Sequence, residues 1–194
     1  MTNPKYGKAL LNVDQNLENI IKGCKKNNPA DQERLYKLFY NYGLTICSRY
    51  AYNREEAGEI FNDAFVKIFR NIEKFEFKGP FKNWIQPIFV HCAIDHYRKF
   101  YERKGPPPVA LDTAGDVGVP TEIISKMDYH SLLEMIRSLP PVYGVVFNLA
   151  MVEGYKHSEI AEMLNISEGT SKSNLSRAKS KMKALITAQN LVTE

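Results

Sequence analysis

The stretch that decides the fold is residues 157–183, HSEIAEMLNISEGTSKSNLSRAKSKMK. Apolar residues recur at helical spacing over 157–164 and again from 168 onward, and a short gap at 165–167 separates the two patterns. Ser167 is well placed to cap the second helix, and Glu168 would then lie at that helix's positive end. Two helices joined by so tight a turn are typical of a helix-turn-helix.

The residue pattern of the second helix predicts two different faces. Its inward face should pack on the first helix and comprises Ser171, Leu175, Ala178, Met182 and Leu185. The outward face carries short polar side chains between basic ones, so it can approach base edges while the cations reach phosphates. A merely solvated basic face is the alternative. The candidate contacts with duplex DNA are Glu168, Thr170, Lys172, Ser173, Asn174, Ser176, Arg177 and Lys179.

Composition alone does not identify a partner. The 194 residues carry a formal net charge of +4, too small an excess to predict a polyanion by itself. Cys24, Cys47 and Cys92 are too widely spaced for a disulfide framework or a metal knuckle, which favours a reducing compartment. No apolar run is long enough for a signal peptide or a membrane span. We therefore expect a cytoplasmic protein without membrane insertion.

The rest of the chain predicts an all-α fold of two small helical domains. Residues 1–104 should form a helical bundle and 129–194 a four-helix domain that contains the helix-turn-helix. Between them, 105–128 is acidic and rich in Pro and Gly, which predicts a flexible linker. The other helices are expected near 14–27, 31–50, 54–72, 79–100, 129–138 and 141–153.

Three residues are expected to set local features of the first domain. Asp31 is well placed to cap the second helix, and Asn53 to cap the third. Pro87 falls inside the fourth helical pattern, where it removes a backbone hydrogen bond, so we expect a kink or a break into two helices there.

Two segments together resemble one family. GYKHSEIAEMLNISEGTSKSNLSRAKSKMK, residues 154–183, resembles the promoter-reading helix-turn-helix of bacterial sigma factors, and FKGPFKNWIQPIFVHCAIDHYRK, residues 77–99, resembles their promoter-melting region. The order of the segments and the short chain resemble the extracytoplasmic-function (ECF) group. The resemblance implies a non-enzymatic subunit that brings core RNA polymerase to promoter DNA, without a cofactor or metal, and that an anti-sigma factor commonly restrains.

The resemblance also assigns a polymerase-binding segment. EIFNDAFVKIF, residues 59–69, resembles the part that docks on the clamp of the largest core subunit. The residues at the matching positions are Glu59, Asn62, Asp63 and Phe65. Independently, Glu55, Glu59 and Asp63 form an acidic row at helical spacing that suits a basic partner, although a solvated helix face gives the same pattern.

The segment from 75 to 101 resembles the part that recognises the opened minus-ten element. An unpaired strand needs aromatic rings for its bases and cations for its backbone, and this segment has both. By the resemblance, the loop KFEFKGP, residues 74–80, would capture a flipped base. Phe81 and Trp84 are expected to pack on each other instead of stacking on a base. The candidate contacts are Phe75, Phe77, Lys78, Lys82, Trp84, His91, Arg98 and Lys99.

Two other classes of protein remain as alternatives. One is a helix-turn-helix regulator whose N-terminal domain does not bind core polymerase. The other is an enzyme or metal-binding bundle, but His91 and His96 would lie about 140° apart around a helix, so no ligand set converges there.

Overall fold

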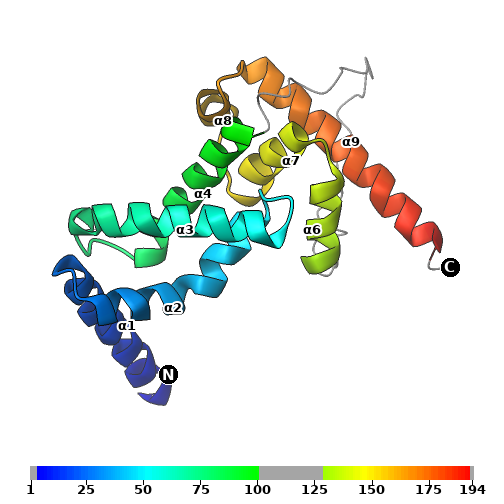
Figure 1. The fold of residues 1–194 in the computed structure, drawn as a ribbon. Helices are drawn as coiled ribbons and strands as arrows, with labels where there is room; N and C mark the ends of the chain where they lie inside the picture. The colour runs from blue at the N-terminus through cyan, green and yellow to red at the C-terminus, as the bar shows by residue number, and fades with distance from the viewer. Residues whose placement is uncertain (1–3, 101–128, 193–194) are drawn as a thin grey trace. The chain divides into compact units, whose positions relative to one another are not determined.

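The computed structural model describes residues 4–100 and 129–192. All regular secondary structure in these residues is helical, and none of them forms a strand. The all-α fold class is therefore confirmed. In chain order the elements are α1 (Pro4–Lys25), α2 (Pro29–Ser48), α3 (Arg54–Asn71), the 3₁₀ turn η1 (Ile72–Lys74), α4 (Phe81–Phe100), α6 (Tyr129–Ser138), α7 (Pro141–Phe147), the π-helical η3 (Asn148–Val152), α8 (His157–Leu164) and α9 (Glu168–Val192) (Figure 1).

Backbone contacts divide the chain into two compact units. The first unit comprises Met1–Cys47 and Gly58–Cys92, and the second comprises Ser48–Ala57 and Ala93–Glu194. The domain limits expected from the sequence stay a prediction, and the expected linker at 105–128 lies outside the described residues.

Aromatic rings form the core of the first unit. Phe61 of α3 and Phe89 of α4 are buried and stack, with ring centroids 5.7 Å apart. Gly43 of α2 faces this pair, and a Cβ atom there would lie 2.4 Å from the Phe89 ring. Because such a distance is a clash, glycine at 43 is what lets α2 approach α3 and α4 so closely.

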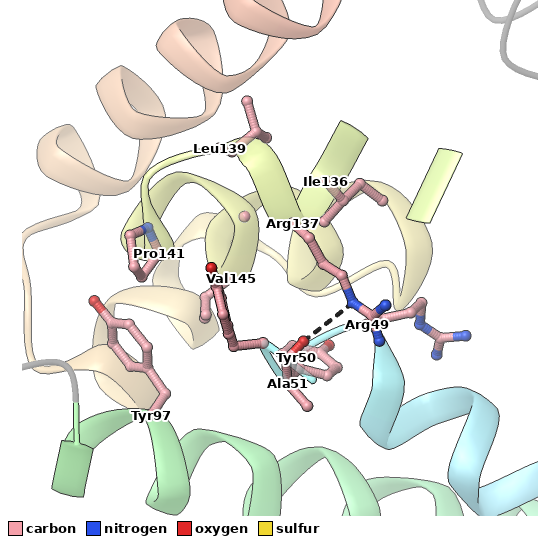
Figure 2. Close-up of a pocket in the computed structure, with 11 residues that line it drawn as sticks. Arg49, Tyr50, Ala51, Tyr97, Ile136, Arg137, Leu139, Pro141 and Val145 are labelled. Atoms are coloured by element: carbon pink, nitrogen blue, oxygen red, sulfur yellow. Dashed lines mark hydrogen bonds between the residues drawn. The ribbon is translucent and has the colours of Figure 1, made fainter. Parts of the chain in front are cut away.

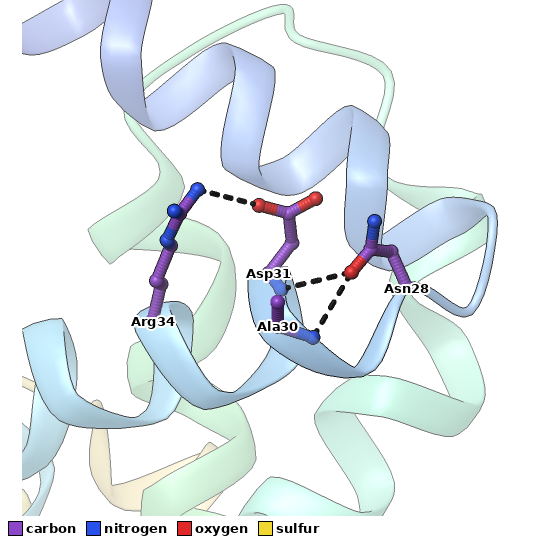
Figure 3. A network of polar contacts seen from close by, with 4 residues as sticks. All are labelled: Asn28, Ala30, Asp31 and Arg34. Atoms are coloured by element: carbon purple, nitrogen blue, oxygen red, sulfur yellow. Dashed lines mark hydrogen bonds and ion pairs between the residues drawn. The ribbon is translucent and has the colours of Figure 1, made fainter.

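The start of α2 corrects one expectation. The side chain of Asn28, not that of Asp31, caps the helix: its Oδ1 accepts hydrogen bonds from the backbone N–H of Ala30 at 2.9 Å and of Asp31 at 3.3 Å (Figure 3). Asp31 instead pairs with Arg34, one turn further along. The expected cap of α3 is confirmed, because Asn53 Oδ1 accepts from the N–H of Glu56 at 2.8 Å.

Pro87 does not break the fourth helix, which runs as one α-helix from Phe81 to Phe100. Ile85 lies on one side of the proline and Phe89 and Val90 on the other, and all three are fully buried. Burial of both halves against the core offsets the hydrogen bond that the proline removes.

In the second unit α7 and α8 both pack against α9. The buried side chains of Val146, Leu149, Ile160 and Met182 supply much of the apolar contact. Two polar contacts also lie inside this unit: the amide of Asn148 donates to the carbonyl of Arg49 at 2.6 Å, and the Arg49 guanidinium forms an ion pair with Glu153.

Candidate nucleic-acid and polymerase interfaces

The α8–turn–α9 segment has the geometry of a helix-turn-helix. α8 ends at Leu164, and its C-cap residue Asn165 adopts a left-handed backbone with φ 52°. The N–H of Ile166 returns to the carbonyl of Ala161 at 3.0 Å. Ser167 then caps α9, since its Oγ accepts from the N–H of Thr170 at 3.0 Å. The expected cap and the expected turn are both confirmed.

A partly buried hydrogen bond joins α8 to α9. Ser171 is fully buried, and its Oγ lies 2.8 Å from Nδ1 of His157 at the start of α8. A serine in this apolar interface is therefore satisfied, and the bond holds the first turns of the two helices together.

The inward face of α9 is wider than expected. Ser171, Leu175, Ala178 and Met182 are buried as predicted, but Leu185 is only half-buried and Ile186 is buried. Asn174, one of the predicted DNA contacts, is only 6% exposed. It lies about 60° around the helix from Ser171, so the neighbouring helices cover a broader stripe than the apolar pattern suggested.

The other candidate DNA contacts of α9 lie at the surface. Glu168, Thr170, Lys172 and Ser173 are exposed, and Ser176, Arg177 and Lys179 are half-buried. Lys172 Nζ lies 3.9 Å from the Glu168 carboxylate, a loose pair in water. The hydroxyl of Ser173 donates to the Thr170 carbonyl at 3.0 Å, which keeps the side chain close to the helix. Together these residues form a shallow polar surface with cations along it.

In the first unit, the loop after η1 combines packed and exposed aromatic rings. Phe75 and Phe81 are buried, with ring centroids 5.0 Å apart, and Trp84 is half-buried against both at 5.6 Å. The expectation that Phe81 and Trp84 pack is confirmed. Phe77 is 38% exposed, and its ring lies edge-on to Phe75 at 4.9 Å.

Phe77 has an unusual backbone. Its φ is 58°, a left-handed conformation that costs about 1–3 kcal/mol for a side chain of this kind and that persists only where the surroundings impose it. Beside it, Lys78 is exposed and forms an ion pair with Glu76. Lys82 is also exposed, and its Nζ lies 5.3 Å from the Tyr42 ring centroid.

An open cavity of about 310 Å³ lies between α3 and α4. Its lining combines cations with aromatic and polar groups, and the side chains are Lys67, Asn71, Lys74, Trp84, Ile88 and His91. His91 is exposed, and its Nδ1 lies 2.6 Å from the carbonyl of Pro87. Two predicted contacts, Trp84 and His91, thus share one hollow with Lys74 of the predicted loop and with Lys67, which the sequence reasoning did not select.

The remaining two predicted contacts lie near the end of α4, in the second unit. Lys99 is exposed, whereas Arg98 is half-buried and its Nη2 donates to the Glu162 carbonyl at 3.4 Å. The expected segment continues to residue 101, which lies outside the described residues.

The predicted polymerase-binding residues of α3 divide into a surface set and a buried one. Glu59, Asn62 and Asp63 are exposed, as is Glu55 of the acidic row. Asn62 Oδ1 accepts a hydrogen bond from the Tyr36 hydroxyl at 3.0 Å. Phe65 is 3% exposed and packs on Phe61 at 4.8 Å, so its place is beneath this surface and not on it.

A cavity in the second unit is too small for an organic substrate. It measures about 50 Å³, room for water, and Figure 2 shows Arg137 at its edge donating through Nε to the Ala51 carbonyl at 3.3 Å. Among the residues that the structure describes, no group of three or more His, Cys, Asp or Glu side chains is arranged to hold a metal ion. None of the described helices is long and apolar enough to cross a membrane.

The buried Cys24 and the half-buried Tyr155 are poorly suited to nucleophilic chemistry. Burial, together with the nearby negative charge of Asp31, raises the pKa of the Cys24 thiol to about 11, so the thiol stays protonated at neutral pH. Burial likewise raises the pKa of the Tyr155 hydroxyl, with smaller contributions from Glu153 and Glu159.

Comparison with known proteins assigns two parts of the chain to one family. Residues 35–103 match the family described as sigma-70 region 2, and residues 129–182 match sigma-70 region 4. The ECF RNA polymerase sigma factor SigW of Bacillus subtilis (strain 168) is 24% identical over 180 residues, which cover 86% of this chain and 95% of SigW. The RNA polymerase sigma factor HrpL of Pseudomonas syringae pv. syringae is 25% identical over 161 residues, which cover 81% and 84% of the two chains.

A solved structure is also similar. The sigma factor RpoE of Bartonella quintana, in a co-crystal with the anti-sigma factor NepR, gives a TM-score of 0.49 at 16% identity and covers 81% of this chain and 97% of that chain.

The two matched regions define a transcription initiation factor of the sigma-70 type. The chain belongs to the ECF-type RNA polymerase sigma factors, a non-enzymatic family that binds core RNA polymerase and promoter DNA.

Sequence reasoning missed the contribution of α1 to the loop after η1. Lys25 Nζ lies 2.6 Å from the carbonyl oxygen of Phe75 and 3.3 Å from that of Glu73. These residues are about fifty positions apart in the chain, and no local pattern connects them. The only signal was the spacing of Lys22 and Lys25 at i, i+3, which places both on one side of α1.

Proposed function

We propose that this sigma factor divides promoter reading between its two matched regions. In the proposal, the outward face of α9 reads the minus-thirty-five element as duplex. The loop at 74–80 and the start of α4 capture the opened minus-ten strand and assist strand separation. The exposed side of α3 docks on the clamp of the largest core polymerase subunit. Because core polymerase and promoter DNA share the cytoplasm, we infer that the protein acts there.

One observation carries the proposal: two surfaces of opposite character occur in one chain. The α9 surface has short polar groups and cations on a regular, capped helix, which suits the major groove. The first unit has an exposed phenylalanine and exposed lysines in an irregular loop, which suits unpaired bases and their phosphates.

Support for the polymerase contact comes from charge. Glu55, Glu59 and Asp63 are exposed along one side of α3, and a basic partner would be complementary to them. Phe65 supports this side from within, because it packs against Phe61 and Phe89. An anti-sigma factor is a further expected partner, and this expectation rests on the family resemblance alone.

Run-off transcription tests the proposal directly. Purified core polymerase is mixed with the full chain and a library of promoter templates, and transcripts are sequenced to recover the promoter that the protein selects. We expect specific initiation and co-purification of the protein with core. Absence of both would exclude the proposed function and would favour a helix-turn-helix regulator that acts without core.

Two variants separate the proposed roles. Arg177→Ala is expected to weaken binding of a duplex that carries the selected upstream element while leaving core binding unchanged. Asp63→Lys reverses one charge of the acidic row and should weaken core binding while leaving duplex binding unchanged. If either variant lost both activities together, misfolding and not a local role would explain the result.

A further inference from the structure

The inference concerns Lys25, which lies outside both matched regions, and it rests on the proposed function. Lys25 is half-buried near the end of α1, and its ammonium group bridges two backbone carbonyl oxygens, those of Glu73 and Phe75. These carbonyls lie at and just after the C-terminal end of η1, where helical turns leave oxygens without partners. Lys25 thereby fixes the point at which the loop leaves η1.

The same ammonium group also faces the exposed ring of the loop. Lys25 Nζ lies 5.0 Å from the ring centroid of Phe77, and Lys22 Nζ lies 5.9 Å from it. A cation within about 6 Å of an aromatic centroid is attracted to the ring. With Phe75 edge-on at 4.9 Å, the Phe77 ring therefore has defined neighbours although 38% of the residue is exposed.

The strained backbone of Phe77 indicates that this arrangement has a function. A left-handed φ at a residue with a large side chain is unfavourable unless the surroundings impose it, and strain of this kind gathers at functional sites. Lys25 acts on both sides of the strained residue, since it holds the carbonyl two positions earlier and attracts the ring itself. The cost of ordering an exposed ring is thus met before any ligand arrives.

We propose that Lys25 is a positioning residue for single-stranded DNA: it holds the loop so that Phe77 is presented as a stacking surface for an unpaired base. The ammonium group of Lys25 already contacts two carbonyl oxygens and a ring. Lys25 therefore affects DNA binding by placing Phe77 and not by contacting a phosphate. Exposed lysines of the loop, such as Lys78, remain at the surface for the DNA backbone.

The test uses the full chain and two fluorescent probes of equal length and equal charge. One is oligothymidylate of about twelve nucleotides, within the site size of such grooves, and the other is the same strand with abasic sites in place of bases. Lys25→Met is compared with Lys26→Met, because Lys26 is the exposed neighbour and both changes remove one positive charge. Binding is followed by fluorescence anisotropy over a series of salt concentrations.

We expect Lys25→Met to bind oligothymidylate about tenfold more weakly than Lys26→Met, because one base loses an ordered stacking partner. On the abasic strand the two variants should bind equally. Phe77→Leu should show the same base-dependent loss, and adding Lys25→Met to it should weaken binding no further, since both changes remove one interaction.

Four outcomes would overturn the inference. Equal binding of oligothymidylate by Lys25→Met and Lys26→Met would remove any special role of Lys25. A loss that appears equally on the abasic strand, with a salt dependence reduced by about 0.7 in log–log slope, would make Lys25 a direct phosphate contact. Unchanged binding of oligothymidylate by Phe77→Leu would show that Phe77 is not a stacking surface, and this result does not depend on whether Lys25→Met folds. If the unmodified chain bound neither probe, strand capture by this region would fail, and the role of Lys25 with it.

Discussion

The two candidate DNA-reading surfaces are built on different structural principles. The α9 surface is a regular helix whose cap, Ser167, and whose neighbours along one face are set by local spacing. The loop of the first unit depends on a lysine about fifty positions away and on a strained phenylalanine. A duplex offers a repeating groove that a helix fits, whereas an unpaired strand offers separate bases that need individually placed rings. Regular structure therefore suits the first surface and irregular structure the second.

The largest expected effect comes from destabilising the first unit and measuring whether the α9 surface still binds its duplex. Phe61 is 1% exposed at the centre of the first unit, so Phe61→Ala should reduce the free energy of unfolding of that unit by about 3–5 kcal/mol. Urea unfolding followed by circular dichroism measures the loss. We expect oligothymidylate binding to fall while binding of the upstream duplex is retained.

The matched control is Leu38→Ala, because Leu38 lies in the same unit but is 56% exposed, and its removal should change stability by less than about 0.5 kcal/mol. Equal loss of duplex and single-strand binding in Phe61→Ala would mean that the two surfaces do not act separately.

A smaller change in the same core uses two glycines. Gly43→Ala places a methyl group 2.4 Å from the Phe89 ring, and overpacking of this kind should reduce stability by about 1–3 kcal/mol. Gly58→Ala is the control, since no atom outside the adjacent residues and the local backbone of α3 lies within 4 Å of its Cβ position, and it should increase stability by roughly 0.5–1 kcal/mol. Thermal melts of the two variants should therefore move in opposite directions. A stabilised Gly43→Ala variant would contradict the packing described for α2.

Loss of the α9 cap should affect the duplex surface alone. Ser167→Ala removes the oxygen that accepts from the N–H of Thr170, at a cost of about 1 kcal/mol in helix stability. Upstream duplex binding should weaken, and oligothymidylate binding should not change. Ser158→Ala, at an exposed position of α8, is the control and should leave both unchanged. If Ser167→Ala bound the upstream duplex as tightly as the unmodified chain, α9 would not need its cap to keep its first turn in place.

The smallest expected effect is on the salt dependence of duplex binding, and it distinguishes specific binding of α9 in the major groove from non-specific attraction by a basic helix. Lys172→Ala should reduce the slope of log affinity against log salt for the upstream duplex by about 0.9, the value for one lost phosphate contact. Lys181 carries the same charge further along α9 and is also exposed, so Lys181→Ala is the control and should change the slope less. Equal slopes for the two variants would favour the simpler interpretation of α9 as a solvated basic face.

Local patterns predicted most helices and two of the three helix caps. Ser167 and Asn53 were predictable because each accepts from an N–H three positions later. The cap of α2 was assigned to Asp31 instead of Asn28, because both residue types are good caps and only the course of the preceding chain decides between them.

Features that depend on distant packing could not be predicted. Asn174 is polar and follows the basic pattern, yet the neighbouring helices cover it. Pro87 is a helix breaker by its chemistry, yet buried residues on both sides keep α4 continuous. The contact of Lys25 with the loop has no local signature, since it joins the end of α1 to a segment beyond α3. For Asn174 and Pro87, tertiary packing outweighed the preference of a single residue.

Trp84 is the only tryptophan in the chain, and it lies half-buried against Phe75 and Phe81 at the base of the loop that carries Phe77. Its intrinsic emission therefore reports on the first unit without any label, while the α9 surface is optically silent when the indole alone is excited. A base that stacks near the loop should quench or shift that emission, and a duplex bound to α9 should leave it unchanged. The molecule thus contains its own spectroscopic reporter for one of its two surfaces, so the order in which they engage a promoter can be followed in real time.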